Sequence, residues 1–317
     1  MSTISSPSGA GGHPAGPLTT GSRIGPYVVD SLIAAGSMGA VYRARDTRLN
    51  RPVALKVLAP AMTGDTAGLA RFTQEARTTA LLNHPNIVVV YDVGSECGMP
   101  YVVSELLHGE TLRARLRGGT LPVRVAVDYA REIAHGLVGA HDLDVVHRDL
   151  KPENVFITGD GRVKILDFGL AKCRNETLGI PTAGSSESTQ PGTILGTVGY
   201  MAPEQVRGSA ADARADIFSL GVILHEMLAG PPPFVRESAI ETLYAILRED
   251  APPLPYRDGL SPELAHIVGH CLEKMPAARF QSARDLAFIL GFALRSPQPL
   301  APAPAAHRLF ASLVALF

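Results

Sequence analysis

The sequence predicts an α+β protein in which a small β-rich unit precedes a larger, mostly helical unit. Short apolar runs typical of strands dominate residues 27–105, whereas helix-like apolar periodicity dominates residues 111–294. The chain has 317 residues, 46% of them hydrophobic, so it can bury a sizeable core and is long enough for two packed units. We therefore expect a cleft between two lobes, a common place for a binding pocket.

The two units differ in their local signals. The strand-like segments of the first unit are 28–29, 41–42, 53–57, 87–91 and 101–103, and its helix-like segment is 69–82. In the second unit, Pro122 stands at the first turn of a predicted helix. Residues 215–229 are apolar on nearly all sides and end at Gly230, which predicts a helix buried in the core.

Both ends of the chain have an unusual composition. Residues 1–22 are rich in Ser, Thr, Gly and Pro, so we expect a flexible arm that cannot offset its ordering entropy. Residues 296–317 begin with closely spaced prolines, typical of an extended linker, and end in the apolar stretch 309–317. That stretch is about half as long as a membrane span. It predicts a docking helix or a disordered end, and the alternative is a membrane anchor cut short.

Composition and charge exclude several classes of protein. Lys and Arg total 29 and Asp and Glu total 30, a balance that a nucleic-acid-binding protein or an acidic tail would not have. Three widely spaced cysteines cannot form a disulfide scaffold and favour a reducing compartment. The N-terminus lacks a signal-peptide pattern, and no run reaches about 18 apolar residues. We expect a cytoplasmic protein without a nucleic-acid partner and with no evident membrane association.

Two glycines near the start of the first unit form a candidate phosphate-binding loop. Gly36 and Gly39 would let the backbone approach a phosphate and present its N–H groups, although a tight hairpin explains the same spacing. Strand-like residues follow, which disfavours a dinucleotide-binding fold because a helix would come next. Lys56 ends a strand-like run, and Glu75 in the predicted helix is a candidate ion-pair partner.

The most informative stretch is the polar segment 147–154, which reads HRDLKPEN between apolar runs. Asp149 could accept a proton from a hydroxyl, and Asn154 offers an amide oxygen. Asp167 follows in the tripeptide Asp-Phe-Gly, after another strand-like run. Carboxylate and amide oxygens are ligands that Mg²⁺ prefers, together with phosphate oxygens. The spacing therefore predicts a divalent-cation site next to a phosphate.

In this order the motifs resemble those of the protein kinases, and among them the bacterial serine/threonine kinases of eukaryotic type. The resemblance covers residues 27–291 and includes the Gly-rich loop, VALK at 53–56, HRDLKPEN at 147–154, DFG at 167–169, GTVGY at 196–200, APE at 202–204, Asp216 in DIFSLG and Arg279 in PAARF. It implies a two-lobed protein kinase fold over residues 27–292, with an N-lobe at 27–105 and a C-lobe at 108–292. It also implies transfer of the ATP γ-phosphate to Ser or Thr hydroxyls of proteins, with Mg²⁺ or alternatively Mn²⁺ as the cation.

The resemblance assigns roles to individual residues. Lys56 would contact the α- and β-phosphates and pair with Glu75. Asp149 would accept the substrate proton, and Lys151 would steady the transferred phosphoryl group. The metal ligands would be Asn154 and Asp167. The nucleotide-binding set comprises the loop over the phosphates, the walls of the adenine pocket and the segment along the adenine edge: Ile33, Ala34, Ala35, Gly36, Ser37, Met38, Gly39, Ala40, Val41, Ala54, Glu105, Leu107 and Phe156.

Two positions depart from the pattern of the family. Ala34 replaces the first glycine of the loop, which predicts a stiffer loop and weaker nucleotide binding. Ser104 stands where relatives commonly carry a larger residue, which predicts space behind the adenine. The alternative to an active enzyme is a pseudokinase scaffold that binds nucleotide or partners without phosphoryl transfer. Ala34 favours this alternative. The presence of Lys56, Asp149, Asn154 and Asp167 opposes it.

The segment between Asp167 and Glu204 is rich in Ser and Thr, and Arg148 precedes the candidate catalytic Asp149. Arginine can form charge-assisted hydrogen bonds with a phosphorylated side chain. We therefore expect autophosphorylation in this segment, with Thr189 and Thr193 as the favoured sites. A homodimer in which one copy phosphorylates the other is one way to achieve it.

Overall fold

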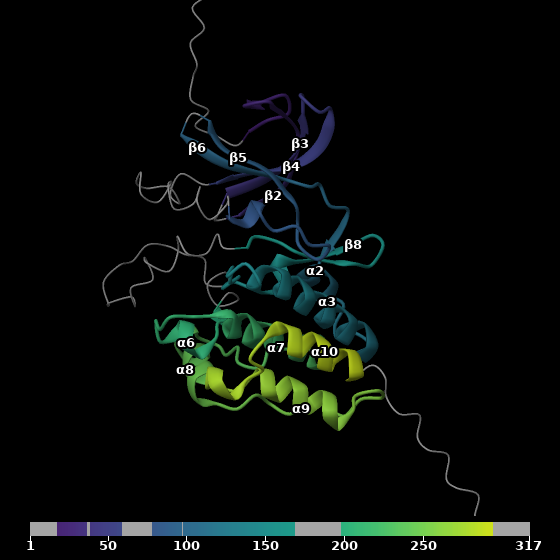
Figure 1. The fold of residues 1–317 in the computed structure, drawn as a ribbon, viewed down its shortest axis with the longest axis vertical. Coiled ribbons are helices and arrows are strands. Elements are labelled where there is room, and N and C mark those ends of the chain that lie inside the picture. The colour runs from purple at the N-terminus through teal and green to yellow at the C-terminus, as the bar shows by residue number, and fades with distance from the viewer. Residues whose placement is uncertain (1–17, 37–38, 59–77, 97, 169–197, 294–317) are drawn as a thin grey trace, which may run out of the picture.

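The computed structural model describes residues 18–36, 39–58, 78–96, 98–168 and 198–293. These residues form two lobes stacked along the long axis of the molecule, with the strand-rich lobe above the helical one (Figure 1). This is the α+β, two-lobed arrangement that the sequence predicted.

The N-lobe is a six-stranded antiparallel sheet. Its order is β1-β2-β3-β4-β6-β5, built from β1 (Arg23–Ile24), β2 (Tyr27–Gly36), β3 (Gly39–Asp46), β4 (Arg51–Leu58), β5 (Val90–Glu96) and β6 (Met99–Ser104). Val53 and Leu55 of β4 are fully buried in the core of this lobe. Because side chains alternate along a strand, Lys56 faces away from this core, toward the cleft.

The C-lobe begins with a small three-stranded sheet, β7 (Gly109–Thr111), β8 (Val155–Thr158) and β9 (Val163–Ile165), in the order β7-β8-β9. The helices that the structure describes in this lobe are α2 (Leu112–Leu116), α3 (Val123–His141), α6 (Pro203–Val206), α7 (Ala213–Ala229), α8 (Ala239–Arg248), α9 (Pro262–Cys271) and α10 (Ala283–Ala293). Two short 3₁₀ helices span Pro152–Asn154 and Pro276–Ala278.

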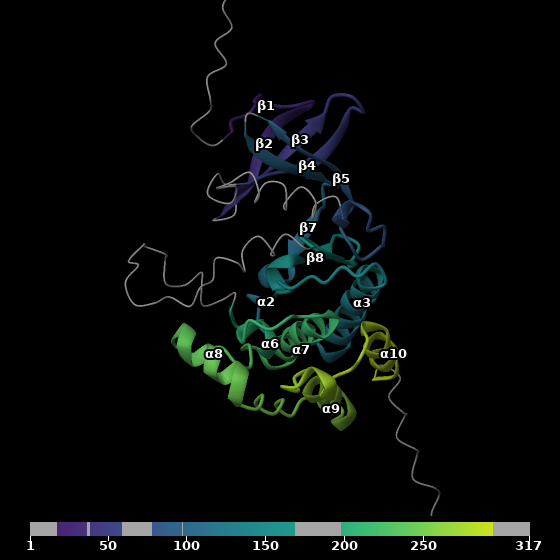
Figure 2. The ribbon, with the colours of Figure 1, turned by 60° about the vertical axis from the view of Figure 1, so that its left-hand side comes forward.

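Helix α7 is the centre of the helical lobe. All of its residues from Ala215 to Leu228 are buried, as its apolar sequence predicted. Figure 2 shows α7 in the middle of the lobe, with α3 on one side and α9 on the other. Two charged side chains of this helix, Asp216 and Glu226, are nevertheless buried, so each needs polar partners.

The structure corrects two local predictions. Strand β5 begins at Val90 and not at Ile87, because Ile87 instead forms a bridge with Ile165 of the other lobe. Residues 18–22, predicted as part of a flexible arm, are hydrogen-bonded to the sheet. Leu18 N donates to the Tyr42 hydroxyl at 3.1 Å, and Gly21 N donates to Val29 O at 2.8 Å.

The remainder of the arm, the Pro-rich linker and the apolar stretch 309–317 lie outside the described residues, as does most of the predicted helix 69–82. Residues 78–80 of that helix are described and are helical. Within the described residues, no helix is long and apolar enough to span a membrane.

Candidate active site

A buried carboxylate on α7 fixes the shape of the loop 147–154. Asp216 is fully buried and accepts hydrogen bonds from the backbone N–H groups of His147 at 2.8 Å and Arg148 at 2.9 Å. Its Oδ2 also lies 2.8 Å from His141 Nε2. Arg148 has a φ of 65°, a conformation that costs a non-glycine residue of the order of 1–3 kcal/mol. The hydrogen bonds to Asp216 offset this strain and hold the loop in place.

The loop brings the predicted proton acceptor, the predicted lysine and the amide together. Asp149 Oδ2 lies 2.9 Å from Lys151 Nζ and 3.3 Å from Asn154 Nδ2. The Asn154 amide also donates to the Asp149 backbone carbonyl at 2.8 Å. With its N–H groups directed at Asp149, Asn154 keeps its Oδ1 atom without a hydrogen bond from any described residue. That oxygen is available to a cation.

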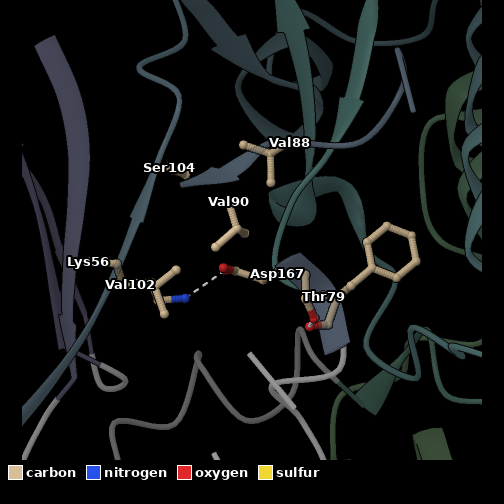
Figure 3. A pocket seen from close by; sticks show the side chains of 8 residues that line it. Lys56, Thr79, Val88, Val90, Val102, Ser104 and Asp167 are labelled. Carbon is tan, nitrogen blue, oxygen red and sulfur yellow. Dashed lines mark hydrogen bonds and ion pairs between the residues drawn. The ribbon is translucent and has the colours of Figure 1, made fainter. Parts of the chain in front are cut away.

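Asp167 lies across the cleft from Lys56. Asp167 Oδ2 is 2.7 Å from Lys56 Nζ, and the Asp167 side chain is 36% exposed (Figure 3). Burial acts to raise the pKa of the Asp167 carboxyl, but the charge and hydrogen bond of Lys56 outweigh burial and hold this pKa below its usual value. Asp167 is therefore ionised at neutral pH and partly open to the cleft.

Hydrogen bonds join the segment at Asp167 to the loop 147–154. His147 Nε2 lies 2.9 Å from the Leu166 carbonyl, and Leu166 N donates to Asn154 O at 2.8 Å. Asp167 itself has a φ of 57°, so its backbone is strained like that of Arg148. Strained non-glycine residues are enriched at functional sites. Of the four described non-glycine residues with positive φ, Arg148 and Asp167 lie in the two segments predicted to carry the chemistry.

The donor set of Asn154 and Asp167 fits a magnesium ion. A carboxylate and an amide oxygen are hard ligands, and Mg²⁺ commonly takes one or two carboxylates together with substrate phosphates. The described residues contain no group of three or more His, Cys, Asp or Glu side chains suited to a metal. An ion held jointly by protein and phosphate does not need such a group.

A cavity of about 50 Å³ adjoins these residues (Figure 3). Its lining combines apolar side chains with the ion pair at the cleft: Lys56, Thr79, Val88, Val90, Val102, Ser104, Asp167 and Phe168. Ser104 therefore borders open space, as the small size of its side chain predicted. Its hydroxyl lies 3.4 Å from the carbonyl of Glu105, one of the residues predicted to contact the adenine edge.

The predicted phosphate loop is the hairpin between β2 and β3. Ala34 pairs with Val41, Ala35 with Ala40, and Gly36 with Gly39, while Ile33 precedes them on β2 and is exposed. Gly39 has a φ of 131°, and a Cβ atom there would lie 2.0 Å from the Val57 carbonyl oxygen. This position therefore requires glycine. Ser37 and Met38 lie outside the described residues.

The remaining predicted nucleotide contacts lie on strands of both lobes and on the connection between the lobes. Ala54 on β4 pairs with Ser104 on β6, and Phe156 lies on β8. Leu107 follows β6 in the connection between the lobes. The Glu105 side chain binds Val89 N at 2.9 Å and Lys164 Nζ at 2.6 Å, which braces this connection. Glu75 lies outside the described residues, so its predicted pairing with Lys56 stays a prediction.

The sequence motifs assigned no role to three residues that help to form the site, namely His147, Asp216 and Thr79. Asp216 was noted as a motif residue, and a charged residue in a largely apolar helix was a signal that it has polar partners. His147 begins the polar stretch, but its hydrogen bond to Leu166 joins segments far apart in sequence. Thr79 donates to the Phe168 carbonyl at 2.9 Å, and nothing in its sequence context indicates this contact.

Known proteins resemble this chain at the level of both sequence and structure. The sequence model described as "Protein kinase domain" matches residues 27–287. Serine/threonine-protein kinase PknL of Mycobacterium tuberculosis is 41% identical over 259 residues, covering 81% of this chain and 63% of the relative. Serine/threonine-protein kinase PknB of Mycobacterium leprae is 38% identical over 266 residues, covering 82% of this chain and 42% of the relative. The chain thus spans between about two fifths and two thirds of the length of these relatives.

Among solved structures, the crystal structure of the Mycobacterium tuberculosis PknI kinase domain matches with a TM-score of 0.67 and 27% sequence identity. The match covers 87% of this chain and 100% of that one. A family match over most of the chain, a shared two-lobed fold and a cleft that brings Lys56, Asp149, Asn154 and Asp167 into one site agree with one another. The chain belongs to the protein kinase family, whose members use ATP and a divalent metal ion.

Proposed function

We propose that this chain transfers the γ-phosphate of ATP to Ser or Thr hydroxyls of proteins, with Mg²⁺ as the cation and Mn²⁺ as a possible replacement. The observation that carries the proposal is the pairing of Lys56 with an ionised, partly exposed Asp167, beside the joined set Asp149, Lys151 and Asn154. A pseudokinase has no need for all of these charges. The names of the relatives support the choice of Ser and Thr as acceptors.

The side chains divide the work of phosphoryl transfer, which depends mostly on positioning and charge stabilisation. Asp149 orients the acceptor hydroxyl and takes its proton, and Lys151 at 2.9 Å stabilises the charge that develops on the transferred group. Lys56 binds phosphate oxygens from the N-lobe side. Asn154 and Asp167 would hold Mg²⁺, which would supply charge neutralisation at the phosphates.

The test of this function is incubation of the purified chain with ATP and Mg²⁺, followed by phosphosite mapping. We expect phosphate on Ser and Thr, including Thr189 and Thr193, which lie outside the described residues. Arg148 supports this choice, because its Nε atom is buried and has no hydrogen-bond partner among the described residues. This arginine can donate charge-assisted hydrogen bonds to a phosphate on the loop. Because the Thr189→Ala, Thr193→Ala variant cannot form them, it should be at least about tenfold less active.

Two results would contradict these proposals separately. No transfer with either Mg²⁺ or Mn²⁺ would support the scaffold alternative. Full activity of the double variant would refute only the assignment of the loop sites. A specific rate that rises with protein concentration would indicate that one copy phosphorylates another in a transient homodimer.

The cavity beside Ser104 leads to a prediction on ligand size. ATP-site ligands with a bulky apolar group at this position should bind, and Ser104→Met should weaken them roughly tenfold by filling the space. The KM for ATP should change little. Ser95→Met, at an exposed position of β5, is the matched control. If Ser104→Met weakens the binding of ATP as much as the binding of the bulky ligands, then Ser104 does not border the adenine.

A further inference from the structure

The side chain of Thr79 reaches from the N-lobe to the segment that carries Asp167. Thr79 is 5% exposed and lies in the helical residues 78–80. Its hydroxyl donates a hydrogen bond to the backbone carbonyl of Phe168 at 2.9 Å. Phe168 is the residue directly after Asp167, and its side chain is fully buried. Thr79 and Asp167 line the same cavity in Figure 3.

Hydrogen bonds restrain the backbone on both sides of Asp167. The carbonyl before it, that of Leu166, lies 2.9 Å from His147 Nε2 of the C-lobe. The carbonyl of the residue after it, Phe168, accepts from Thr79 of the N-lobe. Between these two restraints Asp167 adopts a φ of 57°, which a non-glycine residue retains only when its surroundings over-determine it.

The direction of the Asp167 carboxylate depends on this backbone conformation. Lys56 holds Oδ2 at 2.7 Å, but a lysine on a flexible stem does not fix the orientation of the second oxygen. The orientation of the backbone decides where that second oxygen points. Removing one of the two backbone restraints would let the peptide rotate while the ion pair persists.

We propose that Thr79 is a positioning residue that, through the Phe168 carbonyl, fixes the direction in which Asp167 presents its carboxylate to a nucleotide-bound divalent cation. The inference rests on the proposed function, because it assumes that Asp167 meets a cation there. It adds a determinant of metal affinity that comes from the N-lobe and lies outside the motifs of the site.

The experiment compares three variants of the full chain. Thr79→Val removes the hydroxyl and preserves the shape of the side chain, whereas Thr79→Ser retains the hydroxyl. Thr242→Val is the matched control, because Thr242 is fully buried on α8 and its hydroxyl also donates to a backbone carbonyl, that of Ser238, at 2.9 Å. Urea unfolding establishes that each variant is folded and measures how much the loss of each hydroxyl lowers the free energy of unfolding.

The readout is binding of a fluorescent ADP analogue, N-methylanthraniloyl-ADP, during titration with Mg²⁺. In Thr79→Val we expect the Mg²⁺ concentration for half-maximal binding to rise about fivefold, the effect of losing one hydrogen bond. Binding of the analogue without Mg²⁺ should be unchanged. Thr79→Ser should restore the Mg²⁺ dependence of the unchanged chain, and Thr242→Val should lose stability without altering that dependence.

The outcomes separate the inference from the function on which it rests. If the unchanged chain shows Mg²⁺-dependent binding and Thr79→Val shows the same dependence, the inference on Thr79 is overturned alone. A Thr79→Ser variant that behaves like Thr79→Val overturns it as well, because the hydroxyl is then irrelevant. If the unchanged chain shows no Mg²⁺-dependent nucleotide binding, the proposed function fails and the inference falls with it.

Discussion

Replacing Asp149 with Asn should lower the rate of phosphoryl transfer by a factor of about 10²–10⁴ while the chain stays folded. The amide cannot take the proton of the acceptor hydroxyl. It still offers one oxygen to Lys151 Nζ, which lies 2.9 Å from Oδ2 in the structure, so the local packing is preserved. The measurement is the initial rate of phosphate transfer from labelled ATP, with urea unfolding of the same samples.

The loss should appear in kcat more than in the KM for ATP, because Asp149 acts on the acceptor and not on the nucleotide. Asp160→Asn is the matched control, since Asp160 is an exposed carboxylate beyond β8 that binds Thr158 and Arg162. This control should retain the full rate. An Asp149→Asn chain with an unchanged rate would show that Asp149 is not the proton acceptor and would remove the main support for the proposed mechanism.

Replacing Lys56 with Met tests the same site from the N-lobe, independently of Asp149. It removes the cation that lies 2.7 Å from Asp167 and leaves an apolar chain of similar length. The charge of Lys56 lowers the pKa of Asp167, so this pKa should rise in the variant. The residual activity of the variant should then be lost on the acid side at a higher pH than the activity of the unchanged chain.

The motifs allowed the candidate residues of the site to be named from the sequence because each motif is local. Asp149, Lys151 and Asn154 lie in one loop, so their proximity follows from a few backbone turns. Lys56 and Asp167 required the resemblance to the kinase family, since they come from different lobes. The contact between Lys56 and Asp167 was not itself predicted. The predicted partner Glu75 lies outside the described residues, so that pairing stays a prediction.

Long-range polar contacts could not be predicted from the sequence. Asp216 holds His147 and Arg148 from a helix that folds onto the loop only when the C-lobe core forms. Tertiary contacts also explain why the strand predicted at residues 87–91 was wrong at its start. Their apolar pattern suits a strand, but tertiary packing places Ile87 against Ile165, so the N-lobe strand starts later.

The largest predicted effect on stability concerns the buried ion pair between Arg279 and Glu204. The two side chains form a bidentate pair with both N–O distances at 2.8 Å, and the arginine side chain is fully buried. Arg279→Ala would leave the Glu204 carboxylate buried without its cation, which costs about 3–5 kcal/mol in the free energy of unfolding. The exposed pair of Arg284 with Asp142 is the control, and Arg284→Ala should cost less than about 1 kcal/mol.

A double replacement tests whether this cost comes from the unpaired charge. Arg279→Met combined with Glu204→Leu removes both charges and retains apolar volume, so it should be more stable than the chain with Arg279→Met alone. The carbonyl groups of Glu273 and Arg214, which accept hydrogen bonds from Arg279 at 2.7 and 2.9 Å, would still lose their donor. Stability should therefore recover only in part. A double variant less stable than the single one would mean that the unpaired Glu204 carboxylate is not the source of the cost.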